Sequence, residues 1–422
     1  MNYSKIATKL HSKISKFSGY VSTKLDKTAK RFITESIYGI ISSQSVLLTE
    51  IGRSIETKIS LKKTEDRYCR QLNKPELWNS IEENILQLAA PKIKQETLLI
   101  LDLGDIHKKY AESMEYITYV RDGSDDGKIV KGYWTNQVIA AELDSMEVIP
   151  LYSDLYSQDS PDFLSENTEI IKAIDMVSKQ TENRGIWVID RGGDRDVLYS
   201  HFLAKQNEKR FIVRLIGNRN LLCGNKKQLA LELANQTKCP YSETVVKEEN
   251  GKEKLYHISY GYRKVRVPNY PEKEIYMLVV KGFGEKPMML LTTEKLARNF
   301  KVLQRLLHSY LKRWAIEQTI RFIKQNYDLE NIRLLKYVRL KNMMALLLAV
   351  FYFIAVVLDG AQKLKVLVGH ILKQAKRIFG TPSFHYYAVG DGLSAIFKRA
   401  PQKVIVTDTY REDQLKFCFK IT

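Results

Sequence analysis

Apolar and polar positions change their spacing twice along the chain, and each change marks a predicted boundary. Over residues 1–90 the apolar residues recur every three or four positions, which predicts α-helices. From Glu96 onward, short apolar runs alternate with Gly, Asn and Asp, which is typical of strands joined by turns. The helical spacing returns at 296–360. The pattern therefore predicts a helical N-terminal region followed by an α/β region.

The segment 95–216 is predicted to form one mixed α/β sheet. Its apolar runs indicate a strand order of β-β-β-α-β-α-β, with strands over 97–103, 132–143, 146–155, 185–190 and 209–216, and helices over 167–181 and 194–206. We expect Asn167 to cap the first of these helices. The next segment, 217–295, has apolar runs separated by Gly, Pro and Asn and is interpreted as a β-rich insertion.

One apolar run is a candidate for a membrane-spanning helix. Residues 343–358 read MMALLLAVFYFIAVVL, sixteen positions without a charge, between Lys341 and Asp359. A membrane-spanning helix needs about 20 apolar residues. We therefore predict a buried core helix and no membrane partner. The C-terminal segment 361–422 is mixed in pattern, and its role is left open.

Composition changes the picture by pointing to a polyanionic partner. The chain of 422 residues carries a net charge of +19, which favours nucleic acid over an anionic membrane surface. In the region 1–90, two helices around a break at 57–61 resemble a helix-turn-helix. The second would point four cations outward, and the alternative is a solvated helical bundle: Lys62, Lys63, Arg67 and Arg70. Four scattered cysteines without a C-x-x-C pair suit a reducing cytoplasm.

A narrow polar stripe marks the stretch YLKRWAIEQTIRFIK at 310–324. On a single helix at 100° per residue, Tyr310, Arg313, Glu317 and Lys324 fall within an arc of about 60°. Most of the remaining surface is apolar, so these charges need partners or a ligand. One interpretation is a structural ion pair between Arg313 and Glu317. The other is a metal-binding carboxylate with cations and a phenol placed for phosphates.

Two further acids follow predicted strands. Asp102 ends the run LLIL and Asp190 ends the run WVI. Mg²⁺ prefers oxygen ligands, and two-metal phosphoryl transfer needs several carboxylates. Either acid alone could be a turn or a helix cap. With Glu317 they make a candidate metal-binding triad, in which Asp105 is the alternative first ligand. We interpret His107 as a surface or turn residue rather than a ligand.

These residues resemble a known family. Asp102, the segment VIDRGGD, and the set Tyr310-x₂-Arg313-x₃-Glu317-x₆-Lys324 look like the DDE transposases of bacterial insertion sequences with a Y-R-E-K signature. The likeness covers roughly residues 95–355. The spacings of 88 residues from Asp102 to Asp190 and 127 from Asp190 to Glu317 leave room for the insertion. One departure is Gly104, where members of the family often carry Thr or Ser.

The resemblance implies a fold and a mechanism. It implies a ribonuclease H-like core in two parts, 95–216 and 296–360, with the β-rich insertion between them. The first two Asp would lie on neighbouring strands, and the Glu on a helix against the sheet. Asp102, Asp190 and Glu317 would hold two Mg²⁺ ions, for which Mn²⁺ can substitute. One ion would activate water or a 3′-hydroxyl, and the other would stabilise the leaving oxygen.

The resemblance also implies partners. Tyr310, Arg313, Lys324 and Arg214 would contact DNA phosphates near the cleaved end. The expected substrates are double-stranded DNA with terminal inverted repeats and a target DNA, handled by a homodimer in the bacterial cytoplasm at the nucleoid. The alternatives are a metal-dependent DNA endonuclease without strand transfer, and a non-catalytic DNA-binding protein derived from a transposable element.

Overall fold

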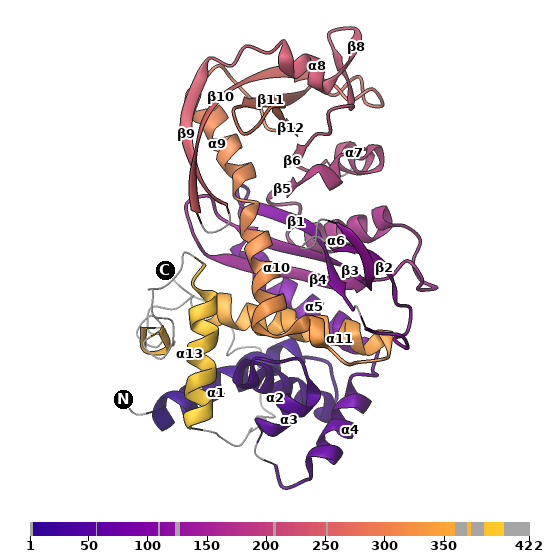
Figure 1. Ribbon diagram of the computed structural model, residues 1–422, viewed down its shortest axis with the longest axis vertical. Helices are drawn as coiled ribbons and strands as arrows, with labels where there is room; N and C mark the ends of the chain where they lie inside the picture. The colour runs from indigo at the N-terminus through magenta and orange to yellow at the C-terminus, as the bar shows by residue number, and fades with distance from the viewer. Residues whose placement is uncertain are drawn as a thin grey trace.

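A computed structural model describes residues 3–55, 57–108, 110–122, 127–205, 208–249, 252–358, 369–372 and 384–400. Most of the segment 361–422, whose role the sequence leaves open, lies outside these residues. Figure 1 shows the chain as an elongated molecule, with the N-terminal helices at one end and the strands of the segment 217–295 at the other.

The N-terminal region is helical, as its apolar spacing predicts. Its elements are α1 (Tyr3–Val21), α2 (Lys27–Ser43), α3 (Leu48–Arg53), α4 (Leu61–Gln71), α5 (Glu76–Ala89) and η1 (Ala90–Lys92). In α4, Lys62, Lys63 and Arg70 are exposed, as expected for its outer face. Arg67 corrects the prediction, because its guanidinium pairs with the buried carboxylate of Glu35 at 2.6 Å. One of the four expected outward cations is therefore an internal ion-pair partner.

The predicted mixed α/β sheet is present. Its first six strands are β1 (Leu98–His107), β2 (Thr118–Asp122), β3 (Lys128–Ala141), β4 (Val148–Tyr156), β5 (Ile186–Ile189) and β6 (Phe211–Arg214). Strand β3 is antiparallel to β1, β2 and β4, whereas β5 is parallel to both β1 and β6. Sequence reasoning missed β2, a short strand in which exposed residues alternate with buried ones.

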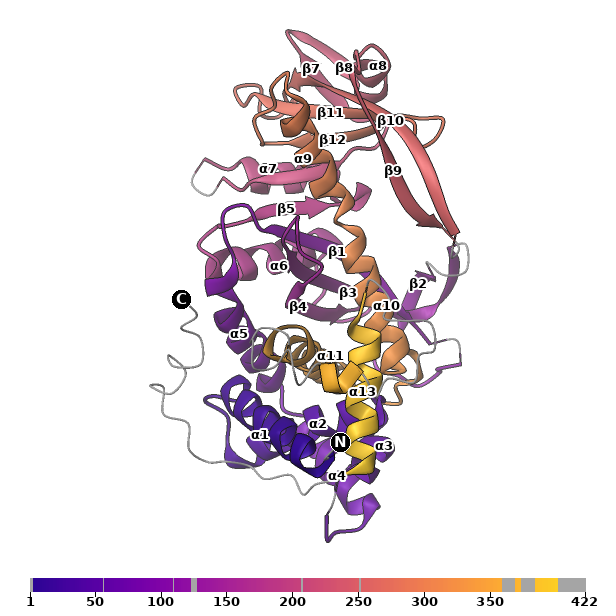
Figure 2. The ribbon, with the colours of Figure 1, turned by 90° about the vertical axis from the view of Figure 1, so that its left-hand side faces the viewer.

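The segment 217–295 extends this sheet. It comprises β7 (Asn220–Cys223), β8 (Lys226–Leu229), α8 (Ala230–Asn235), β9 (Tyr241–Glu249), β10 (Lys252–Val265), β11 (Ile275–Lys281) and β12 (Met288–Thr292). Strand β12 pairs antiparallel with β6, so the sheet runs β2-β3-β1-β5-β6-β12-β11-β10-β9, with β4 also on β3. Strands β7 and β8 form a separate pair. In Figure 2 the long β9–β10 hairpin projects from this end of the molecule.

Two helices flank the strand β5. They are α6 (Glu166–Gln180) and α7 (Asp196–Leu203), with the short turn η2 (Arg191–Gly193) between β5 and α7. The predicted cap of α6 is wrong by two residues, because Ser165 accepts the backbone N–H of Thr168. The side-chain oxygen of Asn167 instead accepts a hydrogen bond from Arg195 at 2.8 Å.

The expected single helix over 310–324 is two helices. They are α9 (Phe300–Leu311) and α10 (Trp314–Asn326). At their junction, the backbone N–H groups of Arg313, Ala315 and Ile316 each bond to the carbonyl three residues earlier rather than four. This tighter turn has fewer residues per turn than an α-helix, so the angle around the axis between Tyr310 and Glu317 differs from that in one continuous helix. The polar stripe drawn on one helical axis is therefore wrong in its geometry.

The apolar run 343–358 is a buried core helix, as predicted. The chain continues after α10 with η3 (Leu329–Asn331), α11 (Tyr337–Tyr352), η4 (Phe353–Leu358) and α13 (Tyr386–Arg399). The stretch Tyr337–Leu358 is long and apolar enough to cross a membrane, but 89% of its most apolar window is buried inside the protein. Figure 1 shows α11 between the N-terminal helices and the sheet, where it joins the two.

Candidate active site

Asp102 and Asp190 lie side by side in the sheet. Strands β1 and β5 are parallel, with Leu101 opposite Ile189, so the next residue of each chain is one of the two acids. Neighbouring strands lie about 4.8 Å apart, and side chains at matching positions point to the same face. The sequence expectation places Asp102 at a strand end, whereas β1 continues to His107 along β3. Only Asp190 follows the last residue of its strand.

Glu317 completes a group that we call the acid cluster, consisting of Asp102, Asp190 and Glu317. Helix α10 packs on β1 and β3 and brings Glu317 to the two strand residues. Burial raises the pKa of Asp102 to about 7, a rise opposed by Arg313 and increased by the neighbouring charges of Asp190 and Glu317. Asp190 and Glu317, distant from Asp102 along the chain, therefore both act on it electrostatically.

Arg313 is the cation of the acid cluster. Its guanidinium approaches Asp102 at 3.6 Å and donates a hydrogen bond to Glu317 at 2.6 Å. The residue is 8% exposed, whereas the side chain of Glu317 is 47% exposed. The helix junction places Arg313 between the two acids, because it precedes the first residue of α10. The Arg313–Glu317 ion pair of the first interpretation forms, and Asp102 is a second carboxylate beside the same guanidinium.

Tyr310 and Arg214 lie on the sheet side of the acid cluster. Burial raises the pKa of Tyr310, an effect opposed by the nearby charges of Arg313 and Arg214. Arg214 is the last residue of β6, the neighbour of β5. Thus six of the seven sequence-predicted site residues gather at one place: Asp102, Asp190, Glu317, Arg313, Tyr310 and Arg214.

Lys324 is the predicted site residue that lies elsewhere. Its ammonium is 3.3 Å from Asp105 and 3.4 Å from Glu330. His107 adds its ring nitrogen at 3.1 Å from Glu330. Among the described residues, Asp105, His107 and Glu330 are the one group of three whose side-chain atoms could converge on a metal. Sequence reasoning missed Glu330, because nothing in its local pattern marks it.

This second group differs from the acid cluster in already holding a cation. Lys324 lies seven residues after Glu317, about 10 Å along the axis of α10. Its ammonium occupies the position that an ion would take between Asp105 and Glu330. Asp105, the alternative first ligand, therefore pairs with Lys324 and not with Asp190 or Glu317.

The departure at Gly104 has a structural reason. Gly104 pairs with Thr135 across β1 and β3, and a Cβ built at Gly104 would lie 2.8 Å from the hydroxyl oxygen of Thr135. Ile320 of α10 lies on the same side, 3.8 Å from that Cβ position. A Cβ at this position would therefore require the Thr135 side chain to shift, whereas Ile320 is at ordinary contact distance. A hydroxyl is present at this position on the neighbouring strand β3, at Thr135.

Asp194, the second acid of the VIDRGGD segment, holds the loop after Asp190 in place. Its carboxylate accepts hydrogen bonds from the Tyr199 hydroxyl at 2.9 Å, the Ile216 backbone N–H at 2.7 Å and Arg219 at 2.6 Å. Asp190 itself accepts the N–H of Gly192 at 2.7 Å. The loop that carries Asp190 is therefore fastened to the loop after Arg214.

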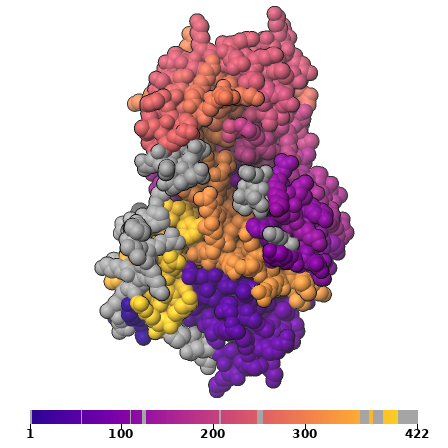
Figure 3. Space-filling view, viewed as in Figure 1, coloured from indigo at the N-terminus to yellow at the C-terminus, as the bar shows by residue number. Residues whose placement is uncertain are grey.

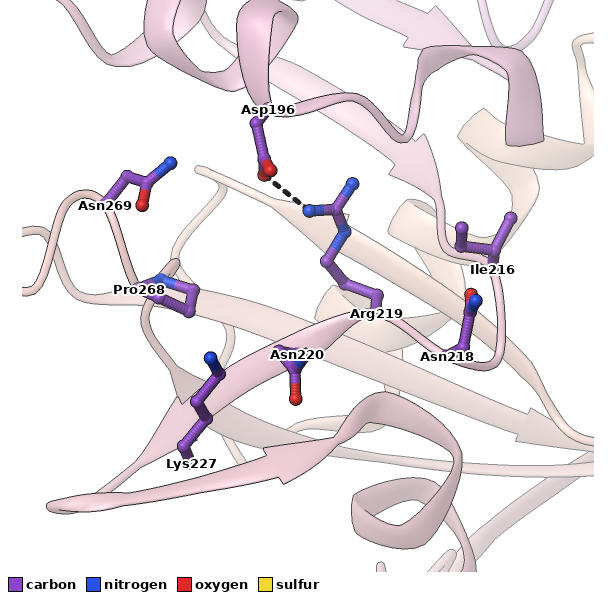
Figure 4. A pocket seen from close by; sticks show the side chains of 8 residues that line it. All are labelled: Asp196, Ile216, Asn218, Arg219, Asn220, Lys227, Pro268 and Asn269. Carbon is purple, nitrogen blue, oxygen red and sulfur yellow. Dashed lines mark hydrogen bonds and ion pairs between the residues drawn. The ribbon is translucent and has the colours of Figure 1, made fainter.

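A small polar pocket lies on the far side of this fastening. It is lined by Asp196, Ile216, Asn218, Arg219, Asn220, Lys227, Pro268 and Asn269. Figure 4 shows Arg219 pointing at Asp196 across the pocket, where the two form an ion pair. Members of the acid cluster are absent from its lining, so the pocket is separate from the candidate active site.

Comparisons with known proteins give likenesses to solved structures but no match in sequence. No protein-family model matches the chain, and no curated protein matches it. One similar solved structure is the cryo-EM structure of a piggyBac transposase synaptic complex with hairpin DNA. The likeness covers 97% of this chain and 82% of that chain, with 10% identity and a TM-score of 0.44. A likeness at this level assigns neither an activity nor a residue.

Proposed function

We propose that this protein is a DDE-type DNA transposase that cleaves the ends of an insertion sequence and joins them to target DNA. One observation carries the proposal. Asp190 and Glu317, which are 88 and 215 residues after Asp102 in sequence, both lie close enough to Asp102 to raise the pKa of its buried carboxyl group. Neighbouring carboxylates repel one another, and a bound cation would reduce this repulsion.

The strand order supports a ribonuclease H-like core. Strands β4, β3 and β1 form an antiparallel series, and β5 and β6 then add in parallel on the other side of β1. The family resemblance implies the first two acids on neighbouring strands and the third on a helix against the sheet. Asp102, Asp190 and Glu317 have this placement on β1, after β5 and on α10.

The acid cluster fits magnesium by its chemistry. All three candidate ligands are carboxylates, which Mg²⁺ prefers. Asp190 and Glu317 both raise the pKa of Asp102, and a divalent cation would offset this repulsion between like charges. Asp102, Asp190 and Glu317 would hold two Mg²⁺ ions, with Mn²⁺ as a substitute. When bound, such ions supply Lewis-acid activation of an attacking hydroxyl and stabilisation of a leaving oxygen.

The chain's own residues would orient the DNA. Arg313 has one guanidinium between two acids, so a phosphate beside it would share the hydrogen-bond donors that now face Glu317. Arg214 and Tyr310 would fix the same strand of DNA from the side of β6. Lys324 would act about two helical turns further along α10. Two DNA ends must meet during transposition, so we propose a homodimer on DNA in the bacterial cytoplasm.

The test is cleavage of DNA that carries the two flanks of the gene. With Mg²⁺ present, Glu317→Gln and Asp190→Asn should lower the cleavage rate at least about 100-fold, because each removes a ligand charge. Both variants should still bind the DNA. Gln318→Ala is the matched control, because Gln318 is an exposed neighbour on α10, and it should cleave normally. Full activity in Glu317→Gln would refute the catalytic role.

A second assay separates the outcomes within this class. A duplex with a pre-cleaved 3′ end is incubated with a supercoiled plasmid, and joined products are counted. Joining supports a transposase. Cleavage without joining would make the protein a metal-dependent nuclease. Binding without either would make it a transposase-derived DNA-binding protein.

A further inference from the structure

The hairpin formed by β2 and β3 has an exposed face of unusual composition. In the antiparallel register, Tyr119 lies opposite Lys131, and Arg121 lies opposite Ile129. Residues directly opposite each other share a face, and so do residues two apart on one strand. Tyr119 is 64% exposed and Ile129 is 69% exposed. We call this set of four residues the hairpin face.

The opposite face of the same hairpin is buried. Val120, between Tyr119 and Arg121, is 1% exposed, and Thr118 is 5% exposed. The hairpin is therefore fixed to the protein by one face and presents the other to solvent. The large side chains of Tyr119 and Ile129 are not buried against the rest of the protein. A bound partner would bury them, so we interpret this face as a binding surface.

The charge of the hairpin face is of one sign. It contains Arg121 and Lys131 and no acid. Within the described part of the chain, neither side chain has a carboxylate partner, unlike Arg313 at the acid cluster and Lys324 beside Asp105. Arg121 runs over Gly127, whose φ of +77° closes the turn beneath it. An unpaired guanidinium and ammonium can bind a phosphate without first breaking an ion pair.

The hairpin face also lies along the direction of β1. That strand runs from Asp102 to His107, and His107 is opposite Gly132, the neighbour of Lys131. Five residues of strand span about 17 Å, which matches about five phosphates spaced at 3.4 Å along one DNA strand. Helix α10, which carries Glu317, packs on the same two strands β1 and β3. Figure 3 shows this purple segment on the face where the orange helices are visible.

We propose that the hairpin face binds DNA about five nucleotides from the phosphate held at the acid cluster. Arg121 and Lys131 contact backbone phosphates, and Tyr119 and Ile129 contact sugar or base surfaces. A combination of cations and an exposed aromatic on a β-ribbon is chemistry that recognises nucleic acid. An acidic protein would satisfy the cations but not the aromatic and apolar pair. The position of the face relative to the reacting phosphate rests on the proposed function.

The experiment measures how DNA affinity depends on salt. A 30-base-pair duplex of arbitrary sequence is titrated with the full chain between about 50 and 200 mM salt, and log K is plotted against log salt concentration. The double variant Arg121→Ala/Lys131→Ala should reduce the slope by about 1.8, because each phosphate contact contributes about 0.9. Tyr119→Ala should weaken binding, and Tyr119→Phe should restore it, since stacking needs the ring and not the hydroxyl.

A matched control removes the same charge elsewhere. Lys286→Ala/Arg298→Ala deletes two exposed cations outside the hairpin and should leave the slope closer to that of the natural protein. If the hairpin and control variants have the same slope, the hairpin face is not a DNA contact. Thermal melting of each variant shows whether folding is intact. The two proposals can fail separately. If the hairpin variant has a smaller slope while Glu317→Gln still cleaves normally, the hairpin face is supported and the catalytic proposal is refuted.

Discussion

Two groups of partly buried charges in this protein differ in their balance. One is the acid cluster, in which Arg313 pairs with two of the three carboxylates, Asp102 and Glu317. The other, which we call the structural cluster, joins α5, β4, α6 and α11 and consists of Glu82, Asp154, Lys172 and Lys341. In it, Asp154 lies 3.1 Å from Lys172 and 3.0 Å from Lys341.

The difference separates a closed network from an open one. In the structural cluster both lysines lie beside Asp154 and hold its pKa below its usual value although burial opposes them, and burial raises the pKa of Glu82. Nothing further needs to bind. In the acid cluster, burial raises the pKa of Asp102 to about 7, Arg313 opposes this rise, and the charges of Asp190 and Glu317 add to it. Unmatched charge at a partly exposed position is a property of functional sites.

The comparison predicts its largest effect for Lys341→Met. This change removes one partner of a buried pair and leaves Asp154, 3% exposed, with less compensation. We expect a loss of about 3–5 kcal/mol in the free energy of unfolding, because an uncompensated buried charge is costly. Urea unfolding at neutral pH measures it. Lys336→Met is the control, because Lys336 is exposed just before α11. Equal stability of the two variants would show that the structural cluster is not a closed network.

A smaller effect that depends on metal is expected for Arg313→Ala. Without divalent cations the variant should lose about 2 kcal/mol, because three carboxylates are left unopposed. Adding Mg²⁺ should raise its melting temperature by more than that of the natural protein, since a more negative site binds a cation more tightly. Lys341→Met should gain no more from Mg²⁺ than the natural protein does. If adding Mg²⁺ does not change the melting temperature of Arg313→Ala, the result counts against a metal at the acid cluster.

Much of the fold follows from the local apolar pattern. Strands β1, β3, β4, β5 and β6 are apolar runs bounded by polar residues, so periodicity finds them. The apolar pattern does not predict the short strand β2, because it contains no apolar run and its buried residues Thr118 and Val120 alternate with exposed ones. That β12 joins β6 also escapes, because such pairing links residues about 80 positions apart and leaves no mark in either segment.

The site was predictable in its members and not in its geometry. Acids after apolar runs, together with the spacing of Tyr310, Arg313 and Glu317, identify the residues that gather. A helical wheel assumes one straight axis, so it cannot show the tight turn at Arg313 that separates α9 from α10. A helical wheel also leaves out distance along the axis, so it places Lys324 with Glu317 although about 10 Å of α10 separates them and Lys324 pairs with Asp105 and Glu330. The partner Glu330 becomes visible only when η3 folds against β1.

The smallest change within the comparison is Glu82→Gln, and its sign depends on pH. Burial raises the pKa of Glu82 well above its usual value, and the nearby charge of Asp154 adds to the rise. The folded protein therefore retains a proton that the unfolded chain releases, so the stability of the natural protein falls as pH rises above about 4.5. Glutamine has no such proton to lose. We expect the two proteins to have similar stability near pH 4.5, and the variant to be the more stable at pH 8. Urea unfolding across this range tests it, with Glu83→Gln as the exposed control on the same helix. A stability difference that stays constant with pH would mean that Glu82 is already ionised in the folded protein, where it would balance the second lysine of the structural cluster.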